Sequence, residues 1–322
     1  MAVYTEVTDE ALAAFLQAYE LGTVTSFKGI AGGVENTNYA LQTTKGQYIL
    51  TLYEKRVAEA DLPFFIGLMD HLAKAGFPCP QPVRNAHGEA LSTLADRPAA
   101  LVTFLEGIDV KAPAANLCHA AGVAMARLHR SAQGFDIPRA NALNPAGWPS
   151  LVADGRGGAD TVEAGLEALI VDELAHLQTV WPHGIPDGII HADMFPDNVF
   201  FLEGRLSGII DFYFACNDYL AYDIAVSLNA WCFTADLQFD RARAAAFLAG
   251  YQSLRALEED EITALLILCR GAALRFLLTR LVDWLNVPPG ALVVPHDPKA
   301  FSARLRCFQA MNSPWELGLD RR

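Results

Sequence analysis

Basic residues are in short supply: the chain of 322 residues carries 24 Lys and Arg against 37 Asp and Glu, a net charge of −13. An acidic chain is repelled by the phosphate backbone of DNA and RNA, so we expect no nucleic-acid partner. The charge would suit a small cationic or zwitterionic substrate. Acidity that serves solubility alone is the plainer explanation.

Long uncharged apolar runs are missing. A membrane-spanning helix needs about 20 consecutive apolar residues, and even the segment ITALLILCRGAALRFLL contains Arg270 and Arg275. The start of the chain, MAVYTEVTDEALAAFL, has acids where a secretory signal needs basic residues. We therefore expect a cytoplasmic protein with no membrane partner.

Closely spaced cysteine pairs are also absent. The six cysteines show no CxxC spacing, which argues against a zinc site, and most of them are flanked by apolar residues. This pattern is typical of reduced thiols in the core of a cytoplasmic protein. They are Cys79, Cys118, Cys216, Cys232, Cys269 and Cys307.

The length of the chain exceeds what one hydrophobic core usually supports, so we expect two lobes. Strand patterns at 24–30, 38–43 and 47–53 dominate the first part, and long amphipathic helices begin near residue 112. We predict an α+β, bilobal fold: a β-rich lobe over residues 1–103, a hinge over 104–110 and a mainly helical lobe over 111–322. An active site would lie in the cleft between the lobes.

The helical lobe has one predicted interruption. The segment 144–165 is rich in Gly, Pro and Asp, which predicts a loop or a mobile insertion. The remaining helices are expected at 116–130, 167–181, 222–230, 240–256, 259–285 and about 299–309.

The segment IIHADMFPDNVFF, residues 189–201, sets several polar residues between two apolar runs. Strand patterns at 199–202 and 206–210, joined at Glu203 and Gly204, predict a hairpin that follows it. Such a hairpin brings Asn198 and Asp211 to the same open end, and Asp193 lies on the loop that leads there. Taken singly, Asp193 could be a turn residue and Asn198 a cap.

Together these residues predict phosphoryl-transfer chemistry. Two oxygen donors on adjacent strand ends suit Mg²⁺, which takes few protein ligands. A third carboxylate can accept the hydrogen bond of an attacking hydroxyl. The glycines at 32 and 33, between two strands, could cradle phosphates, although an ordinary hairpin turn explains them equally well.

The motifs HADMFPDN, IIDF and YDIA resemble those of the aminoglycoside-phosphotransferase-like kinases, relatives of protein kinases that phosphorylate small-molecule hydroxyls. The resemblance covers nearly the whole chain. The stretches GGVENTNYAL, YILTLYEKR, LPFFIGLMDHLAKAGFP and LRFLLTRLVDW are similar to the homoserine kinase branch of that family.

The resemblance implies a role for each matching residue. Asp193 would be the catalytic aspartate, with His191 supporting its loop. Asn198 and Asp211 would hold Mg²⁺ against the phosphates of ATP, and Asp223 would anchor the loop from the next helix. The residues implied in ATP binding are Gly32, Gly33, Asn36, Phe104, Leu105 and Glu106.

One position departs from the family pattern. Members carry a lysine in the third strand that holds the α- and β-phosphates, and here Thr51 stands in its place. Lys55 and Lys28 are possible substitutes, and ordinary solvated charges are the simpler interpretation of both. Glu59 is a weak candidate for the glutamate that pairs with such a lysine.

The acceptor site is less clear from the sequence. A homoserine substrate needs an anion for its ammonium group and a cation for its carboxylate. Asp218 is a candidate for the first, and Arg275 or Arg280 for the second. Ordinary ion pairs within the protein would explain all three residues as well.

The resemblance therefore predicts an ATP-dependent and Mg²⁺-dependent enzyme that phosphorylates the side-chain hydroxyl of L-homoserine by direct in-line transfer, as a monomer or homodimer. Two alternatives stay open. One is the same chemistry on choline, methylthioribose or an aminoglycoside, and the other is an ATP-binding pseudokinase without turnover, which the missing lysine favours.

Overall fold

The computed structural model describes residues 4–30, 36–54, 57–155, 157–287 and 295–320. The chain divides into two compact units. The first comprises Met1–Glu106 with two short later segments, Phe135–Ile137 and Gly208–Tyr213, and the second comprises the remainder.

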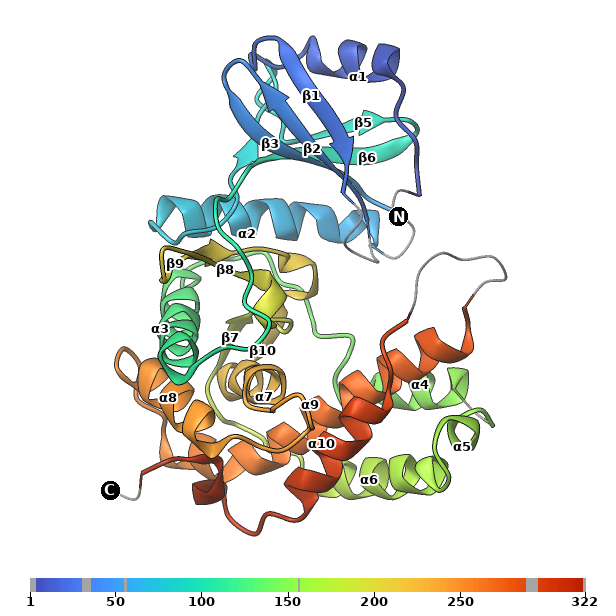
Figure 1. Ribbon diagram of the computed structural model, residues 1–322, viewed down its shortest axis with the longest axis vertical. Helices are drawn as coiled ribbons and strands as arrows, with labels where there is room; N and C mark the ends of the chain where they lie inside the picture. The colour runs from blue at the N-terminus through green and yellow to red at the C-terminus, as the bar shows by residue number, and fades with distance from the viewer. Residues whose placement is uncertain (1–3, 31–35, 55–56, 156, 288–294, 321–322) are drawn as a thin grey trace. The chain divides into compact units, whose positions relative to one another are not determined.

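An antiparallel sheet forms the framework of the first unit (Figure 1). Its strands run in the order β1-β2-β3-β6-β4, with β5 paired to β6. Alternating residues of the second strand are buried, and Leu50 and Leu101, which pair across the third and sixth strands, are both fully buried. The strands are β1 (Val24–Gly29), β2 (Thr37–Thr43), β3 (Gly46–Leu52), β4 (Pro82–Val83), β5 (Leu91–Leu94) and β6 (Arg97–Thr103).

Helix α1 (Asp9–Leu16) begins at Thr8, whose hydroxyl accepts a hydrogen bond from the Ala11 N–H and so satisfies one of the free donors of the first turn. Its Leu12 and Phe15 join the core cluster of the sheet. A short helical turn, η1 (Glu59–Asp61), leads into the second helix of the unit, α2 (Leu62–Lys74).

Helix α2 explains why two distant segments belong to this unit. Phe64 packs edge-on against Phe135, with ring centroids 5.4 Å apart. Phe65 packs edge-on against Tyr213 at 5.5 Å. The predicted single boundary near residue 104 leaves out these two later segments. Their place in the first unit depends on contacts between residues far apart in sequence.

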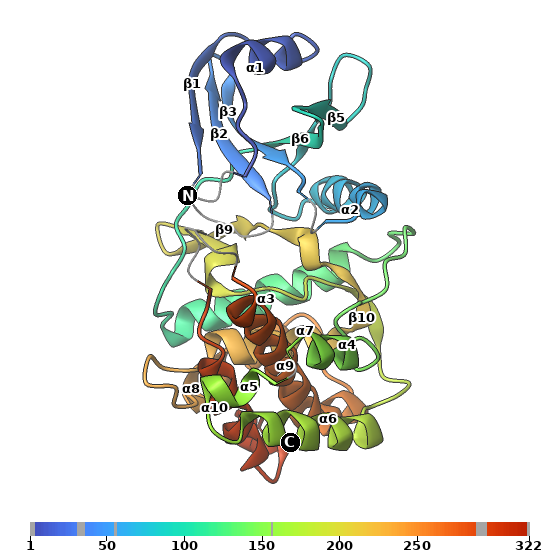
Figure 2. The same cartoon turned by 90° about the vertical axis from the view of Figure 1, so that its right-hand side faces the viewer.

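The second unit is mainly helical. Figures 1 and 2 show α9 running through it, with α7 and α10 packed against it. Two small sheets accompany the helices, β7 with β10 and β8 with β9. The helices are α3 (Ala115–Ser131), α6 (Leu166–Val180), α7 (Leu220–Trp231), α8 (Arg241–Gln252), α9 (Glu259–Leu285) and α10 (Lys299–Gln309), and the strands are β7 (Asp187–Ile190), β8 (Val199–Leu202), β9 (Arg205–Ile209) and β10 (Cys216–Tyr219).

Helices α3 and α8 approach each other closely through two glycines. A Cβ atom added at Gly122 would lie 2.0 Å from the carbonyl oxygen of Phe247, and one added at Gly250 would lie 2.1 Å from that of His119. Both obstacles are backbone atoms, so no side-chain rotation could relieve the clash. The sequence can hold this helix pair together only with glycine at both positions.

Among the helices that the structure describes, only α9 is long and apolar enough to cross a membrane. The buried share of its most apolar window is 67%, and its Leu265, Leu268, Leu274 and Leu277 are fully buried. This burial is the pattern of the core helix of a folded unit.

The prediction of a loop over residues 144–165 is wrong. The segment contains two short helices, α4 (Trp148–Asp154) and α5 (Ala159–Val162). Trp148 is completely buried, packs edge-on against Trp181 with centroids 5.3 Å apart, and donates its indole N–H to the Leu143 carbonyl at 2.8 Å. One well-partnered tryptophan thus orders a stretch whose composition favours a loop.

Candidate active site

The polar segment after β7 is a short loop between two buried strands. Ile190, the last residue of β7, and Val199, the first of β8, are both fully buried, which fixes the two ends of the loop. The loop closes through a helical turn, η2 (Pro196–Asn198). The predicted catalytic residues therefore lie on a segment that is held at both ends by the core of the second unit.

Ala192 lies in the left-handed region of backbone conformation, with φ at 60°. That conformation costs a residue with a side chain roughly 1–2 kcal/mol, so it needs support on both sides. The Ala192 N–H donates to the Asp223 carboxylate at 2.8 Å, and the Ala192 carbonyl accepts a hydrogen bond from the Arg275 guanidinium. Both backbone groups of the strained residue are thus held by buried side chains.

Asp223, on α7, is the main support of the loop. It is fully buried, and besides Ala192 it accepts hydrogen bonds from the His191 N–H and from Nε2 of His129, both at 2.9 Å. Burial opposes ionisation of Asp223, but the hydrogen bond from His129 and the charges of His129 and His191 outweigh it and lower the pKa of this carboxyl. The carboxylate therefore stays ionised below its ordinary range.

His129 extends this support outward. Its Nδ1 lies 2.9 Å from the Tyr251 hydroxyl, which in turn accepts a hydrogen bond from Arg255 at 3.2 Å. Arg255 is paired with the buried Glu261 at 2.9 Å. A continuous chain of hydrogen bonds therefore joins the loop, through Asp223, to the start of α9.

The side chain of His191 is turned into the protein and is completely buried. Its Nδ1 accepts a hydrogen bond from the Asp193 N–H at 3.3 Å. In this position the imidazole braces the loop from within.

Asn198 orients the predicted catalytic aspartate. Its amide nitrogen donates to the Asp193 carbonyl at 2.8 Å and to the Asp193 carboxylate at 3.1 Å. Because both contacts use Nδ2, the amide oxygen of Asn198 faces another direction. An amide oxygen is a ligand that suits a hard cation such as Mg²⁺.

Metal-ligand clusters provide a further test. Among the residues that the structure describes, no group of three or more His, Cys, Asp or Glu side chains could hold a metal ion. This excludes a closed zinc-type site there, but Mg²⁺ needs only one or two carboxylates and keeps several waters. An amide with one carboxylate therefore fits Mg²⁺, and the metal-binding role of Asn198 stays a prediction.

Asp211 follows β9 and belongs to the first unit. It too has a positive φ, 63°, and a helical turn, η3 (Phe212–Phe214), begins directly after it. Burial raises the pKa of Tyr213 to about 12, and the negative charge of Asp211 adds to this shift. Burial also raises the pKa of Tyr53, followed by its interaction with Tyr213, and the charge of Asp211 makes the smallest contribution.

Thr51 occupies the expected lysine position and is an uncharged, buried residue of β3. The side chain is 2% exposed, and its hydroxyl donates to Asn38 Oδ1 at 2.7 Å. Lys28 lies on β1 and is exposed, Lys55 lies outside the described residues, and Glu59 lies exposed in η1. The structure thus gives Thr51 a hydrogen-bonding role within the sheet and no charge.

The predicted ATP-binding residues are described only in part. Gly32 and Gly33 lie outside the described residues. Asn36 is 2% exposed and accepts a hydrogen bond from the Glu54 N–H at 3.2 Å. The Phe104 N–H donates a hydrogen bond to the Gln47 carbonyl at 3.1 Å, which connects the start of the predicted hinge to β3.

Leu105 and Glu106 complete the predicted hinge. The Phe104 side chain is exposed, as is Glu106, and Leu105 is half-buried. The end of the first unit falls directly after Glu106.

Two of the three acceptor-site candidates, Arg275 and Arg280, interact with the catalytic loop, the first by a hydrogen bond and the second through charge. Arg275 is 1% exposed, and its guanidinium lies 4.4 Å from the ring centroid of Phe276 and 5.4 Å from that of Phe214. It therefore contacts the loop from the protein interior and does not face solvent. Arg280, one turn and a half further along α9, is half-buried, and the charges of Asp193 and Asp197 act on it.

Asp218, the third candidate, lies on β10. It accepts hydrogen bonds from Asn141 Nδ2 at 2.6 Å and from the Tyr219 N–H at 2.7 Å. Burial raises the pKa of Asp218, and the hydrogen bond from Asn141 opposes that shift. The carboxylate is therefore fixed in orientation and partly desolvated, as a ligand for a small cation would be.

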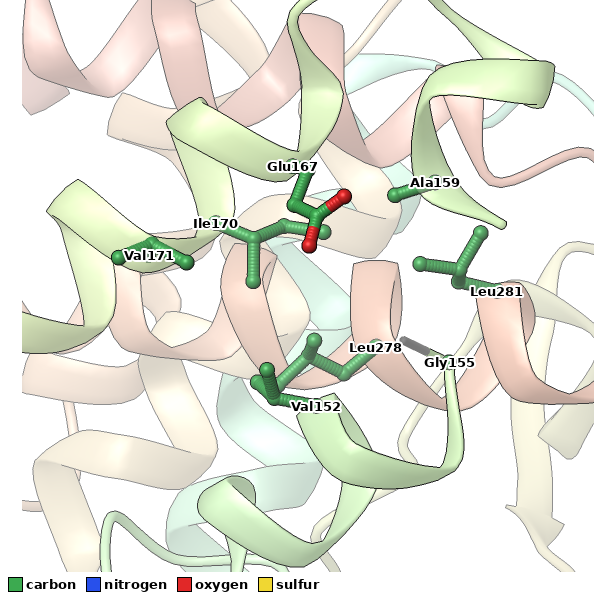
Figure 3. A pocket seen from close by; sticks show the side chains of 8 residues that line it. All are labelled: Val152, Gly155, Ala159, Glu167, Ile170, Val171, Leu278 and Leu281. Carbon is green, nitrogen blue, oxygen red and sulfur yellow. The ribbon is translucent and has the colours of Figure 1, made fainter. Parts of the chain in front are cut away.

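A separate pocket in the second unit has a different character (Figure 3). It lies between α4, α5, α6 and α9, and the one ionisable side chain in its lining is Glu167. A pocket without a cation does not suit phosphate or ATP. Its lining residues are Val152, Gly155, Ala159, Glu167, Ile170, Val171, Leu278 and Leu281.

Comparison with known proteins identifies the family. The pattern described as "Phosphotransferase enzyme family" matches residues 26–257. The homoserine kinase of Methylobacterium radiotolerans is 60% identical over 305 residues, which is 95% of each chain. The chain belongs to the phosphotransferase enzyme family. The homoserine kinase of Sinorhizobium medicae is 54% identical over 321 residues, covering 100% of this chain and 98% of that one.

The relatives and one solved structure bear on two sequence-based predictions. The resemblance to the homoserine kinases is confirmed by these identities. The structure of an amicoumacin kinase in complex with AMP-PNP, Ca²⁺ and Ami has the same fold, with a TM-score of 0.68 at 16% identity over 97% of this chain and 93% of that one. The predicted α+β, kinase-like fold is therefore also confirmed.

Proposed function

We propose that the chain transfers the γ-phosphoryl group of ATP to the side-chain hydroxyl of L-homoserine, giving O-phospho-L-homoserine for threonine biosynthesis. The observation that carries the proposal is the identity of 54–60% to homoserine kinases over nearly the full length of both chains. The catalytic loop supports it, because a rigidly held Asp193 beside Asn198 is what transfer to a hydroxyl requires.

In the proposed mechanism Asp193 accepts the hydrogen bond of the substrate hydroxyl and turns its oxygen toward the γ-phosphorus. Asn198 holds Asp193 in that orientation through its amide nitrogen, and its oxygen serves with Asp211 as a ligand for Mg²⁺. When bound, Mg²⁺ neutralises charge on the phosphates of ATP. As the bond between the hydroxyl oxygen and the γ-phosphorus forms, the bond from that phosphorus to the bridging oxygen breaks and ADP leaves. Asp193 takes up the hydroxyl proton, and no phosphorylated enzyme forms.

Asp223, Arg275 and His191 contribute by keeping the loop in one conformation. The hydrogen bonds of Asp223 and Arg275 fix the strained Ala192, and the His191 ring accepts a hydrogen bond from the N–H of the next residue, Asp193. Orientation of this kind lowers the barrier because the hydroxyl and the phosphate meet without a search for the correct geometry. These residues position Asp193 and need no contact with substrate.

On the ATP side we propose that Gly32, Gly33 and Asn36 line the phosphates and that the chain from Phe104 to Glu106 binds adenine. Thr51 supplies no positive charge, so neutralisation of the phosphates depends on Mg²⁺ more heavily than with a lysine at that position. We propose that the enzyme acts in the cytoplasm, as a monomer or homodimer.

The proposal is tested by measuring ADP release from MgATP with homoserine, choline, methylthioribose and kanamycin as acceptors. We expect turnover with homoserine, reduced by about 10²–10⁴-fold in Asp193→Asn. Asp187→Asn, an exposed aspartate at the start of β7, is the matched control and should keep the wild-type rate.

Two results would contradict the proposal. Turnover with another acceptor but not with homoserine would retain the kinase and change its substrate. Binding of ATP without turnover of any acceptor would favour the pseudokinase, for which the uncharged Thr51 at the expected lysine position is the specific observation.

A further inference from the structure

Two arginines from different helices stack on one aromatic ring in the second unit. Arg280 on α9 lies 4.5 Å from the centroid of Phe301, and Arg304 on α10 lies 4.4 Å from the same centroid. Arg304 also contacts the ring of Phe233 at 5.3 Å. Ring stacking of this kind fixes the plane and direction of a guanidinium group while leaving its N–H donors free.

Neither arginine has an ion-pair partner in the part of the chain that the structure describes, and Nε of Arg304 is buried without an acceptor. This is unusual within the unit. Arg270 is paired with Glu173 at 2.7 Å, and Arg306, two residues from Arg304, is paired with Glu163 at 2.6 Å. The chain therefore supplies carboxylates to neighbouring arginines and leaves this pair without one.

The electrostatics of the pair are unfavourable in the absence of an anion. Burial lowers the pKa of Arg304 to about 10, and repulsion by Arg280 contributes to the shift. Burial also lowers the pKa of Arg280, although the charges of Asp193, Asp197 and Asp297 oppose this. Two like charges that are partly removed from water, and that have no carboxylate at ion-pair distance among the described residues, mark a candidate anion site.

The pair is linked to the catalytic loop by stacked rings. Phe195, on the loop, packs edge-on against Phe276 with centroids 4.9 Å apart. Phe276 stacks on Phe301 at 5.1 Å. Phe301 thus connects the two stacked guanidinium groups to the catalytic loop, and the charge of Asp193 acts on Arg280.

We propose that Arg280 and Arg304 together bind the carboxylate of the acceptor substrate. This inference rests on the proposed function and adds Arg304, which has no motif in the sequence, to its substrate site. Two guanidinium groups can each donate to one carboxylate oxygen, or one can hold both oxygens as a fork. The pair also gives the enzyme a preference for homoserine over amino alcohols, because an acceptor without a carboxylate gains no binding free energy from the two cations.

The first measurement is steady-state kinetics of the full chain with MgATP for Arg280→Gln and Arg304→Met. Hydrogen bonds to charged groups contribute about 1.5–3 kcal/mol each, so the KM for homoserine should rise roughly 10–150-fold in each variant. The KM for ATP should stay unchanged. Arg304→Lys, which keeps the charge, should recover part of the loss.

The second measurement separates carboxylate binding from a general effect. 3-Aminopropan-1-ol is homoserine without its carboxylate, and its kcat/KM should be the same in the wild type and both variants. Arg306→Met is the matched control, because this arginine lies on the same helix but is already paired with Glu163. It should leave the KM for homoserine at the wild-type value.

A purely structural role would give a different pattern. Removing an arginine that lacks an ion pair should leave the melting temperature near that of the wild type, whereas loss of a structural contact should lower it. Homoserine, added with a non-hydrolysable ATP analogue, should raise the melting temperature of the wild type and not that of Arg304→Met.

Three outcomes would overturn the inference. The first is an unchanged KM for homoserine in both variants while the wild type phosphorylates homoserine. The second is an increase confined to the KM for ATP, which would assign the pair to phosphate. The third is no phosphorylation of homoserine by the wild type, which would instead remove the proposed function on which the inference rests.

Discussion

Replacing Asp223 with alanine should disable the catalytic loop without touching a substrate contact. The carboxylate is fully buried and is the acceptor for the backbone N–H groups of His191 and Ala192, at 2.9 and 2.8 Å. A buried donor left without an acceptor costs about 1–3 kcal/mol. Two such donors give a loss of about 2–6 kcal/mol in the free energy of unfolding, a large share of the stability of an ordinary protein.

The same substitution should lower kcat for homoserine at temperatures where the variant is folded. Without Asp223 the strained Ala192 keeps only the hydrogen bond from Arg275, so the loop can relax and Asp193 loses its fixed direction. The assay is a urea unfolding curve followed by circular dichroism, with kcat measured on the same preparation.

Asp240→Ala is the matched control for Asp223→Ala. Asp240 also accepts two backbone N–H groups, those of Ala242 and Arg243 at the start of α8, but it is not bonded to the catalytic loop. Loss of such a cap costs about 0.5–2 kcal/mol, and kcat should be retained. If Asp223→Ala unfolded at the wild-type urea concentration and kept its kcat, the account of the loop given above would be refuted.

Three further predictions concern other features of the chain. Arg270→Ala should lower the free energy of unfolding by about 3–5 kcal/mol, because it leaves the buried Glu173 without its counter-ion. In urea unfolding the double variant Glu173→Gln/Arg270→Ala should recover part of this free energy, and equal losses in the two variants would contradict this prediction. Gly122→Ala should lower the melting temperature by several degrees, since the added Cβ would lie 2.0 Å from the Phe247 carbonyl oxygen, whereas Gly134→Ala, with nothing within 4 Å of its added Cβ, should disturb packing less. The pKa of Asp223 is lower in the folded than in the unfolded chain, so its contribution to stability is present above the unfolded value and is lost as the pH falls through the folded value; urea midpoints between about pH 5 and pH 2 should therefore fall less steeply in Asp223→Asn than in the wild type, and equal slopes would count against this assignment.

The long helices could be predicted because the signals that set them are local. The predicted bounds of α9 and α10 coincide with those observed, and at the start of α9 Glu258 and Glu261 cap each other's backbone N–H groups. The hairpin of β8 and β9 was likewise predictable from its turn and its alternating pattern. Local chemistry and periodicity are sufficient for such elements.

Elements that depend on distant partners could not be predicted in the same way. The pairing of β10 with β7 joins residues such as Cys216 and Ile190, and neither short strand has a strong pattern of its own. The two helices within residues 144–165 depend on the burial of Trp148, and the amino-acid composition of the segment gives no sign of that burial. His129 and Arg304 carry no motif, and their significance arises only from the side chains that the fold places beside them.

The central claim is that Asp193 directs the hydroxyl of homoserine onto the γ-phosphate of ATP. The most direct test is phosphorus NMR with mass spectrometry of the product formed from homoserine and MgATP by the wild type and by Asp193→Asn. The account predicts a phosphomonoester on the side-chain oxygen of homoserine, formed by the wild type and nearly absent with the variant. Equal formation of that product by both proteins, or release of inorganic phosphate without a phosphorylated acceptor, would contradict it.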